Sequence, residues 1–220
     1  MENHTTSPCR ATKTELEKTE NDLGRWQAPT DFAKIVEKMV QRHGDYNLDQ
    51  PGSAFRDAYV ADICARERKA DYVRLGADPP DFELCFAGRI ELFETAEVIA
   101  PNRPRGDELK EDRKRSPQQP RELQHVCEDQ FMSAACALDQ IASVVELKVG
   151  KNYPKRTSLV LYLNIWPIAD VEIYRDGIPA VVAPALAKFN EAWVWDNKEF
   201  RQVVWLDGAP KAQGIDLHRP

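Results

Sequence analysis

The acidic residues Asp81 and Glu94 belong to two consecutive segments that the sequence predicts to be strands. Asp81 opens the apolar run 82–87, and Glu94 lies in the middle of the segment 89–99. Carboxylate oxygens are hard ligands that suit Mg²⁺. A divalent cation held in this way can lower the pKa of a bound water molecule and offset negative charge on a reacting group. If a hairpin brings the two carboxylates together, they could therefore bind a metal ion.

Glu94 is the more informative of the two, because its neighbours on the predicted strand are apolar. Successive side chains of a strand point to opposite faces, so Glu94 shares its face with Ile90, Leu92, Ala96 and Val98. A carboxylate on a buried face is costly unless a metal ion, a hydrogen-bond network or a cation balances it. Both a metal site and a structural ion pair with Lys148 or Arg89 fit this pattern. Glu91 and Glu97 belong to the opposite face, which we expect to meet solvent.

The elements around this hairpin follow from periodicity. An i, i+3, i+4 apolar stripe predicts a helix over 31–42, a second helix is expected over 53–73, and a third is expected to begin at Pro120 and run to about Val149. The apolar run 158–166 reads as a central strand that is covered on both faces. A short helix near 181–189 and a hairpin of 192–195 with 200–206 complete the order.

This order of elements predicts an α/β protein with a mixed central sheet flanked by helices. The chain has 220 residues, of which 42% are hydrophobic, enough for one core of ordinary size. We expect one domain over 28–208, with a flexible N-terminal arm over 1–27, in which a short helix near 13–21 fits, and a polar tail over 209–220. The segment 101–120 is rich in proline and charge and is expected to be a mobile loop.

Composition narrows the setting and the classes of function. The five cysteines form no CxxC pair, and three of them fall in apolar periodic segments, which favours reduced thiols and a cytoplasmic location. No leader or bilayer-spanning segment is expected, so a membrane role is not predicted. The net charge of −6 argues against binding nucleic acid with the whole surface. The sequence lacks the motifs of phosphate-binding loops, dinucleotide-binding folds and serine hydrolases.

Pro80-Asp81, a short hairpin, Glu94-Thr95-Ala96, a long helix and an apolar strand together resemble the PD-(D/E)XK nuclease superfamily. The resemblance covers about 53–166 and implies a restriction-endonuclease-like core. It further implies that Asp81 and Glu94 bind Mg²⁺, or Mn²⁺ in its place, and that a lysine two residues after Glu94 stabilises the transition state. Ala96 occupies that lysine position, so the pattern fails there.

Two residues are candidates to complete such a site. Lys148 extends the apolar stripe of the third predicted helix and is the preferred substitute for the missing lysine, with Lys151 as the weaker choice. Glu67 falls on the inward line of the second predicted helix and could add a metal-binding carboxylate, although a surface or ion-paired position is the more ordinary reading. The alternative is that Ala96 marks a lost active site.

The expected mobile loop could contact a phosphate backbone, because it carries a cluster of basic residues: Arg103, Arg105, Lys110, Arg113, Lys114 and Arg115. A solvated loop of mixed charge explains the same residues equally well. The resemblance therefore gives a first hypothesis, a magnesium-dependent nuclease acting on nucleic acid, with DNA favoured over RNA. The second is a non-catalytic nuclease-fold protein that binds nucleic acid, a protein partner or a second copy of itself. A third is general acid/base chemistry by the carboxylate pair on a sugar or another small molecule.

Overall fold

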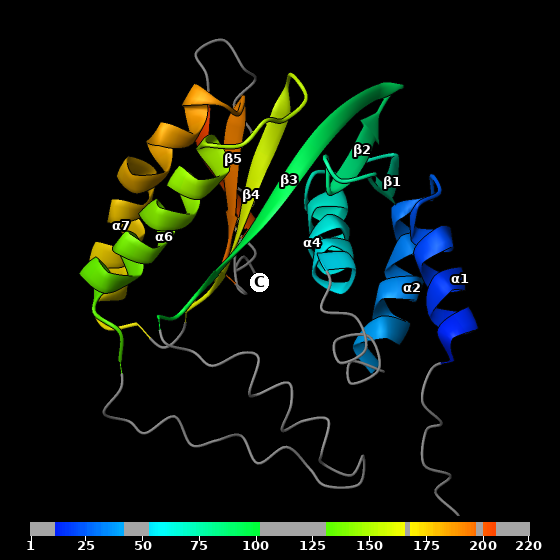
Figure 1. Cartoon of the computed structure of the whole chain (residues 1–220), viewed down its shortest axis with the longest axis horizontal. Coiled ribbons are helices and arrows are strands. Elements are labelled where there is room, and N and C mark those ends of the chain that lie inside the picture. Colours follow the sequence, from blue (N-terminus) through cyan, green and yellow to red (C-terminus); the bar gives the residue numbers. More distant parts are fainter. Residues whose placement is uncertain (1–11, 42–52, 102–130, 166–167, 197–199, 206–220) are drawn as a thin grey trace, which may run out of the picture.

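A six-stranded mixed sheet forms the centre of the protein, with helices on both faces (Figure 1). The computed structural model describes residues 12–41, 53–101, 131–165, 168–196 and 200–205. The strands lie in the order β1-β2-β3-β4-β5-β6, which is also their order along the chain. The predicted α/β class, with a mixed sheet flanked by helices, is therefore confirmed.

The sheet contains two antiparallel edges around a parallel centre. β1 (Tyr72–Leu75), β2 (Phe82–Phe86) and β3 (Arg89–Ile99) are antiparallel neighbours. β3 then pairs in parallel with β4 (Thr157–Asn164), and β4 pairs in parallel with β5 (Glu191–Trp195). β6 (Phe200–Trp205) is antiparallel to β5. Both predicted hairpins and the predicted central strand are thus present.

The tight turn between β2 and β3 sets the register that the site depends on. Ala87 and Gly88 both have positive φ, 48° and 82°, as the two-residue turns that suit twisted hairpins require. The resulting register pairs Phe82 with Phe93 at the far end of the hairpin. Asp81 directly precedes Phe82, the first residue of β2, and Glu94 directly follows its partner Phe93. The two acidic residues therefore lie side by side.

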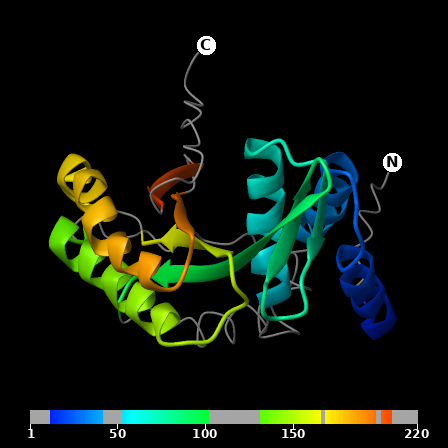
Figure 2. The same ribbon diagram turned by 90° about the horizontal axis from the view of Figure 1, so that it is seen from above.

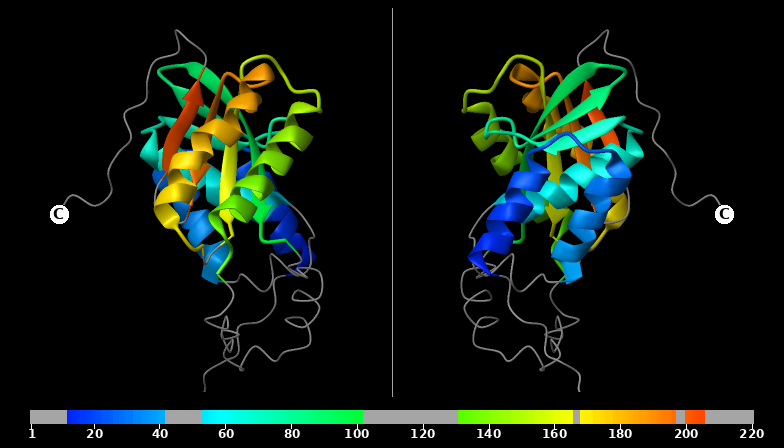
Figure 3. Two further views of the ribbon diagram at one scale, coloured as in Figure 1. Left: turned by 90° about the vertical axis from the view of Figure 1, so that its left-hand side faces the viewer. Right: turned by 90° about the vertical axis from the view of Figure 1, so that its right-hand side faces the viewer.

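Two helices cover one face of the sheet and lie side by side in the left panel of Figure 3. They are α6 (Ala134–Val149) and α7 (Val171–Val182). The Ser133 hydroxyl accepts a hydrogen bond from the Cys136 N–H and so caps the start of α6. Ile141 and Val145 of α6 are buried in one apolar cluster with Ala96 and Val98 of β3. This packing fixes α6 above the face of β3 that carries Glu94.

The opposite face is covered by α4 (Ser53–Glu67), with α2 (Pro29–Gln41) and α1 (Lys13–Leu23) outside it, as Figure 2 shows from above. Phe93 of β3 and Val160 of β4 are buried in a second apolar cluster with Phe32 of α2 and several residues of α4. β3 therefore separates two cores, and consecutive residues of this strand belong to different ones.

The N-terminal half differs from the sequence-based expectation in two places. Residues 12–27 of the predicted arm are packed, because Leu16 and Leu23 of α1 are buried and Gln27 pairs with Val73 of β1. The helix expected over 53–73 ends at Glu67, since Tyr72–Leu75 pairs with β2 as the edge strand β1.

The C-terminal half differs as well. α7 was not predicted, because Gly177 and Pro179 lie inside it and weaken any helical pattern. A Cβ at Gly177 would lie 2.5 Å from a terminal methyl group of Leu138 on α6, so the glycine allows close contact between the two helices. Of the helix expected over 181–189, Ala183–Ala187 form a short 3₁₀ turn.

Several expectations fall outside the described residues. The loop expected up to residue 120, with its six basic residues, lies outside the described residues from position 102 onward. The same holds for the start of the helix expected from Pro120, up to residue 130, for residues 1–11 and for the tail over 209–220. Within the described residues the third predicted helix begins at Ala134. No helix in the described part of the chain has the length and apolar composition that crossing a bilayer would take.

Candidate metal centre

The β2–β3 hairpin brings Asp81 and Glu94 together, as the sequence predicted. The Asp81 N–H donates to the Phe93 carbonyl at 3.0 Å, which continues the strand pairing by one residue. A third carboxylate, from Asp78, joins them, and ligand oxygens of the three side chains all lie within 4.8 Å of one another. Such a spacing allows one cation to contact all three.

Asp78 reaches the cluster because the connection between β1 and β2 is tightly folded. The Gly76 N–H donates to the Asp81 carbonyl at 2.8 Å. A Cβ on Gly76 would lie 2.0 Å from the Pro80 carbonyl oxygen, so only glycine fits this close backbone approach. The sequence reasoning did not single out Asp78, although the run Asp-Pro-Pro-Asp at 78–81 places an acidic residue on each side of the two prolines.

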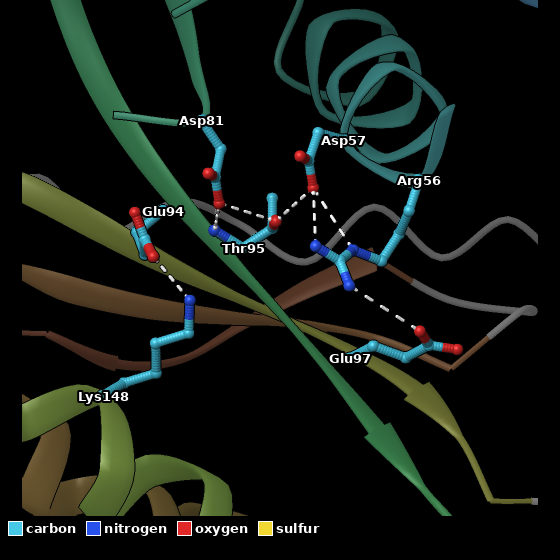
Figure 4. Close-up of polar contacts among 7 residues, drawn as sticks. All are labelled: Arg56, Asp57, Asp81, Glu94, Thr95, Glu97 and Lys148. Atoms are coloured by element: carbon cyan, nitrogen blue, oxygen red, sulfur yellow. Dashed lines mark hydrogen bonds and ion pairs between the residues drawn. The ribbon is translucent and has the colours of Figure 1, made fainter. Parts of the chain in front are cut away.

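Thr95 orients the Asp81 carboxylate, as Figure 4 shows. The Thr95 N–H and its hydroxyl both bond to Oδ2 of Asp81, at 2.7 and 2.8 Å. β2 begins at Phe82, opposite Phe93, and does not extend as far as Thr95. The Asp81 carboxylate therefore takes the place of a strand partner for the Thr95 N–H. The same hydroxyl lies 2.7 Å from Oδ1 of Asp57 on α4, so its single proton is shared between the Asp81 and Asp57 carboxylates, while the Thr95 N–H donates to Asp81 alone. Because two groups of Thr95 hold one carboxylate oxygen, the other oxygen of Asp81 is left for a cation.

Replacing Thr95 by valine is expected to weaken the binding of Mn²⁺ about tenfold, because groups that orient a ligand contribute on this scale to metal affinity. Valine keeps the shape of the side chain and the backbone N–H bond, and loses only the hydroxyl. Isothermal titration calorimetry with Mn²⁺ measures the change. Thr157→Val on β4 is the matched control, since the buried hydroxyl of Thr157 donates to the Pro154 carbonyl in the connection before that strand. Equal affinities of the two variants would contradict this role of Thr95.

Glu94 is buried with one oxygen bonded and the other not. The residue is 4% exposed, and Nζ of Lys148 on α6 lies 2.5 Å from its Oε1. Oε2 is buried and makes no hydrogen bond of normal geometry with any described residue, although the Tyr153 hydroxyl lies beside this carboxylate. Burial raises the pKa of Glu94, and the charge of Asp81 adds to this effect, while the hydrogen bond to Lys148 opposes it. A buried acceptor without a donor is the signature of a group that a ligand completes.

The charges of the cluster and its donor atoms point to the same kind of ligand. Three carboxylates and one ammonium leave an excess of two negative charges when all are ionised. A divalent cation would balance this excess, and oxygen donors of this type suit Mg²⁺ or Mn²⁺. The residues therefore fit a hard divalent cation.

The other residues that sequence reasoning considered do not join the cluster. Glu67 lies ten positions after Asp57, or about 15 Å along the α4 axis at 1.5 Å per residue, and Asp57 is the acid that α4 directs toward Asp81 through Thr95. Lys151 is exposed. Arg89 forms its ion pair with Glu91, at 2.7 Å, and Glu94 pairs with Lys148 instead. Ala96 is 5% exposed and belongs to the apolar cluster.

Glu97 corrects the expectation that the second face of β3 meets solvent. Its side chain is only 3% exposed, because α4 covers that face. Arg56 of α4 approaches Glu97 at 3.8 Å (Figure 4). The Asn164 amide also donates to Glu97, at 3.0 Å. Glu91 is also partly buried, in an ion pair with Arg68 at 2.5 Å. The face of β3 opposite Glu94 is therefore also buried, and it carries both ion-paired and apolar side chains.

Comparison with known proteins adds little to this geometry. No family model and no curated protein matches the chain. Among solved structures, the chain is similar to a protein of unknown function from Pseudomonas aeruginosa strain PAO1 that is described as belonging to the Monooxygenase Superfamily. The two share 14% sequence identity and a TM-score of 0.39, over 82% of this chain and 87% of the other. A similarity at this level assigns neither a family nor an activity.

The comparison nevertheless corrects the predicted family. The structure that it finds is described as a monooxygenase-superfamily protein, and none of the comparisons finds a PD-(D/E)XK nuclease. The predicted membership of that superfamily, its restriction-endonuclease-like label and both nuclease-based hypotheses are therefore contradicted. The mixed sheet and the carboxylate cluster are observations that do not depend on that label.

Proposed function

We propose that this chain is a divalent-cation-binding protein in which Asp78, Asp81 and Glu94 bind Mg²⁺, with Mn²⁺ able to replace it. The observation that carries the proposal is the buried Oε2 of Glu94, which has no hydrogen-bond partner among the described residues and lies in a cluster of three carboxylates. A structural ion pair with Lys148 accounts for Oε1 but leaves Oε2 with only the Tyr153 hydroxyl nearby, at a geometry that does not make a normal hydrogen bond.

Each residue has a distinct part in the proposed site. Asp81 offers the oxygen that Thr95 leaves open, Glu94 offers Oε2, and the exposed Asp78 closes the site from the solvent side. Lys148 holds Glu94 in place through Oε1. When bound, the cation would polarise the oxygen atoms of a ligand or a water molecule. We further propose a cytoplasmic location, because Cys64, Cys85 and Cys136 are free thiols.

Titration of the full-length protein with Mn²⁺ tests the proposal. We expect one saturable site, detected by calorimetry and by loss of the electron paramagnetic resonance signal of free Mn²⁺, with Mg²⁺ competing for it. Asp81→Asn is expected to weaken binding by at least about 100-fold, because loss of a ligand exceeds the 10- to 100-fold effect of a residue that only supports one. Asp139→Asn, an exposed carboxylate on α6, is the control. Equal Mn²⁺ affinity in the wild type and in Asp81→Asn would refute the site.

A further inference from the structure

Tyr153 has a buried hydroxyl that lies beside Glu94 but makes no hydrogen bond of normal geometry with any described residue. The residue lies between α6 and β4, and its ring packs against Phe189 with centroids 4.9 Å apart. Its hydroxyl is buried without a hydrogen-bond partner among the described residues. A buried phenol normally finds a partner for its O–H. Packing on Phe189 explains the position of the ring but not the place of the hydroxyl.

The hydroxyl lies beside the candidate metal centre. Glu94 lies within hydrogen-bonding reach of the Tyr153 hydroxyl, and Asp81 and Asp78 are close enough for their charges to act on it. These are the same three carboxylates that form the cluster. The protonated phenol is therefore a hydrogen-bond donor held at the edge of the proposed cation site.

Lys148 supplies a second donor at the same place. An ammonium group has three N–H donors, and the bond to Oε1 of Glu94 uses one of them. Neither the ammonium nor the phenol O–H can coordinate a cation, but both can donate to a negatively charged oxygen. The cluster thus combines carboxylates that suit a cation with two donors that suit an anion.

We propose that Lys148 and Tyr153 form an anion subsite that binds an oxyanion, such as phosphate, on the cation held by the three carboxylates. This inference rests on the proposed cation site. Without the cation, the carboxylates repel an oxyanion, so the order of binding is fixed: the metal binds first and the anion second. The subsite requires an oxygen that can contact the cation and accept from both donors at once.

The test uses inorganic phosphate and the full-length protein, with and without Mn²⁺. Paramagnetic broadening of the phosphate ³¹P resonance reports phosphate bound to protein-held Mn²⁺, and calorimetry reports the affinity. We expect wild-type protein to bind phosphate only when Mn²⁺ is present. Tyr153→Phe is expected to weaken phosphate binding about tenfold, as loss of a hydrogen bond to a charged group does, while the affinity for Mn²⁺ stays within about twofold.

Two further variants separate the possible outcomes. Tyr59→Phe changes a tyrosine on α4, on the other side of the sheet, and is expected to leave both affinities unchanged. Lys148→Met removes one of the two donors and also the group that holds Glu94, so its phosphate affinity is measured at saturating Mn²⁺, where we expect it to be at least about tenfold weaker than in the wild type. Phosphate binding that is unchanged in Tyr153→Phe, or that occurs without Mn²⁺, would overturn the subsite. Absence of Mn²⁺ binding in the wild type would refute the cation site itself, and the subsite with it.

Discussion

Replacing Glu94 by glutamine is expected to abolish Mn²⁺ binding without lowering the thermal stability of the metal-free protein. The amide keeps the size of the side chain but removes the charge that would face the cation. We expect a loss of affinity of at least about 100-fold, above the range for residues that only support a ligand. Lys148 is 17% exposed, so its ammonium can turn to solvent when its partner is neutral. Calorimetry with Mn²⁺ and thermal unfolding by circular dichroism measure the two effects.

The stability part of this prediction follows from the direction of the pKa shift. Burial raises the pKa of Glu94 despite the bond to Lys148, so the fold disfavours the charged form relative to the unfolded chain. This cost is present at pH 7 and is relieved as the pH falls through the raised pKa toward the ordinary glutamate value of about 4.3. The difference in melting temperature, Glu94→Gln minus wild type, is therefore expected to shrink as the pH is lowered from 7 to about 5.

The matched control is Glu91→Gln on the same strand. Glu91 forms ion pairs with Arg68 and Arg89, at 2.5 and 2.7 Å, so its neutralisation is expected to lower stability and leave Mn²⁺ binding unchanged. If Glu94→Gln instead behaves as Glu91→Gln does, Glu94 is a structural ion-pair partner and the proposed metal centre fails.

Gly76→Ala is expected to destabilise the protein by about 2 kcal/mol, the middle of the range for forcing an extra methyl group into a packed site. The added Cβ would lie 2.0 Å from the Pro80 carbonyl oxygen, and this neighbour is backbone, which cannot rotate away. The turn must open, which moves Asp78 and Asp81 away from Glu94. Urea unfolding measures the stability, and Mn²⁺ titration is expected to show weaker binding in the same variant.

Gly150→Ala controls for the general effect of adding a methyl group to a glycine. Gly150 ends α6 with φ of −69°, and a Cβ there meets carbonyl oxygens at 3.7 Å, which is ordinary contact. Its Mn²⁺ affinity is expected to equal that of the wild type. If Gly76→Ala binds Mn²⁺ as tightly as Gly150→Ala does, the conformation of the 76–81 turn does not determine the site.

Local patterns were sufficient for the central part of the site. The alternation along 89–99 identified the face of Glu94, and the apolar run that Asp81 opens indicated the strand before it. The hairpin that joins them follows from two strands and a short turn. Lys148 was predicted because it continues the stripe of Ile141 and Val145, and helical periodicity transfers well from sequence to structure. These inferences needed only neighbours along the chain.

The rest of the site depends on contacts that no local pattern contains. Asp57 was missed because α4 is buried on most of its surface, between the sheet and α2, so it shows no single apolar stripe. Asp78 and Tyr153 lie in connections, where side-chain directions follow no period. Glu97 was assigned to solvent because the sequence does not show that α4 covers the second face of β3.

The incorrect family prediction shows a second limit of inference from sequence patterns. Three matching positions and an order of elements supported a resemblance, yet the missing lysine at Ala96 already broke the pattern. Acidic residues near a hairpin occur in many folds, and function is a property of the site rather than of the fold. The pairing of Asp81 with Glu94 could be predicted from the sequence, whereas Asp78 and the family of the chain could not.

Glu94 and Thr95 are consecutive, so β3 links two interiors at this point: one side chain meets Lys148 of α6, and the next meets Asp57 of α4. Asp81 forms a hydrogen bond with Thr95 and belongs to the same carboxylate cluster as Glu94. If the proposed site binds a cation, we expect substitutions of Asp57 on α4 to change its affinity through Thr95, although Asp57 does not belong to the carboxylate cluster.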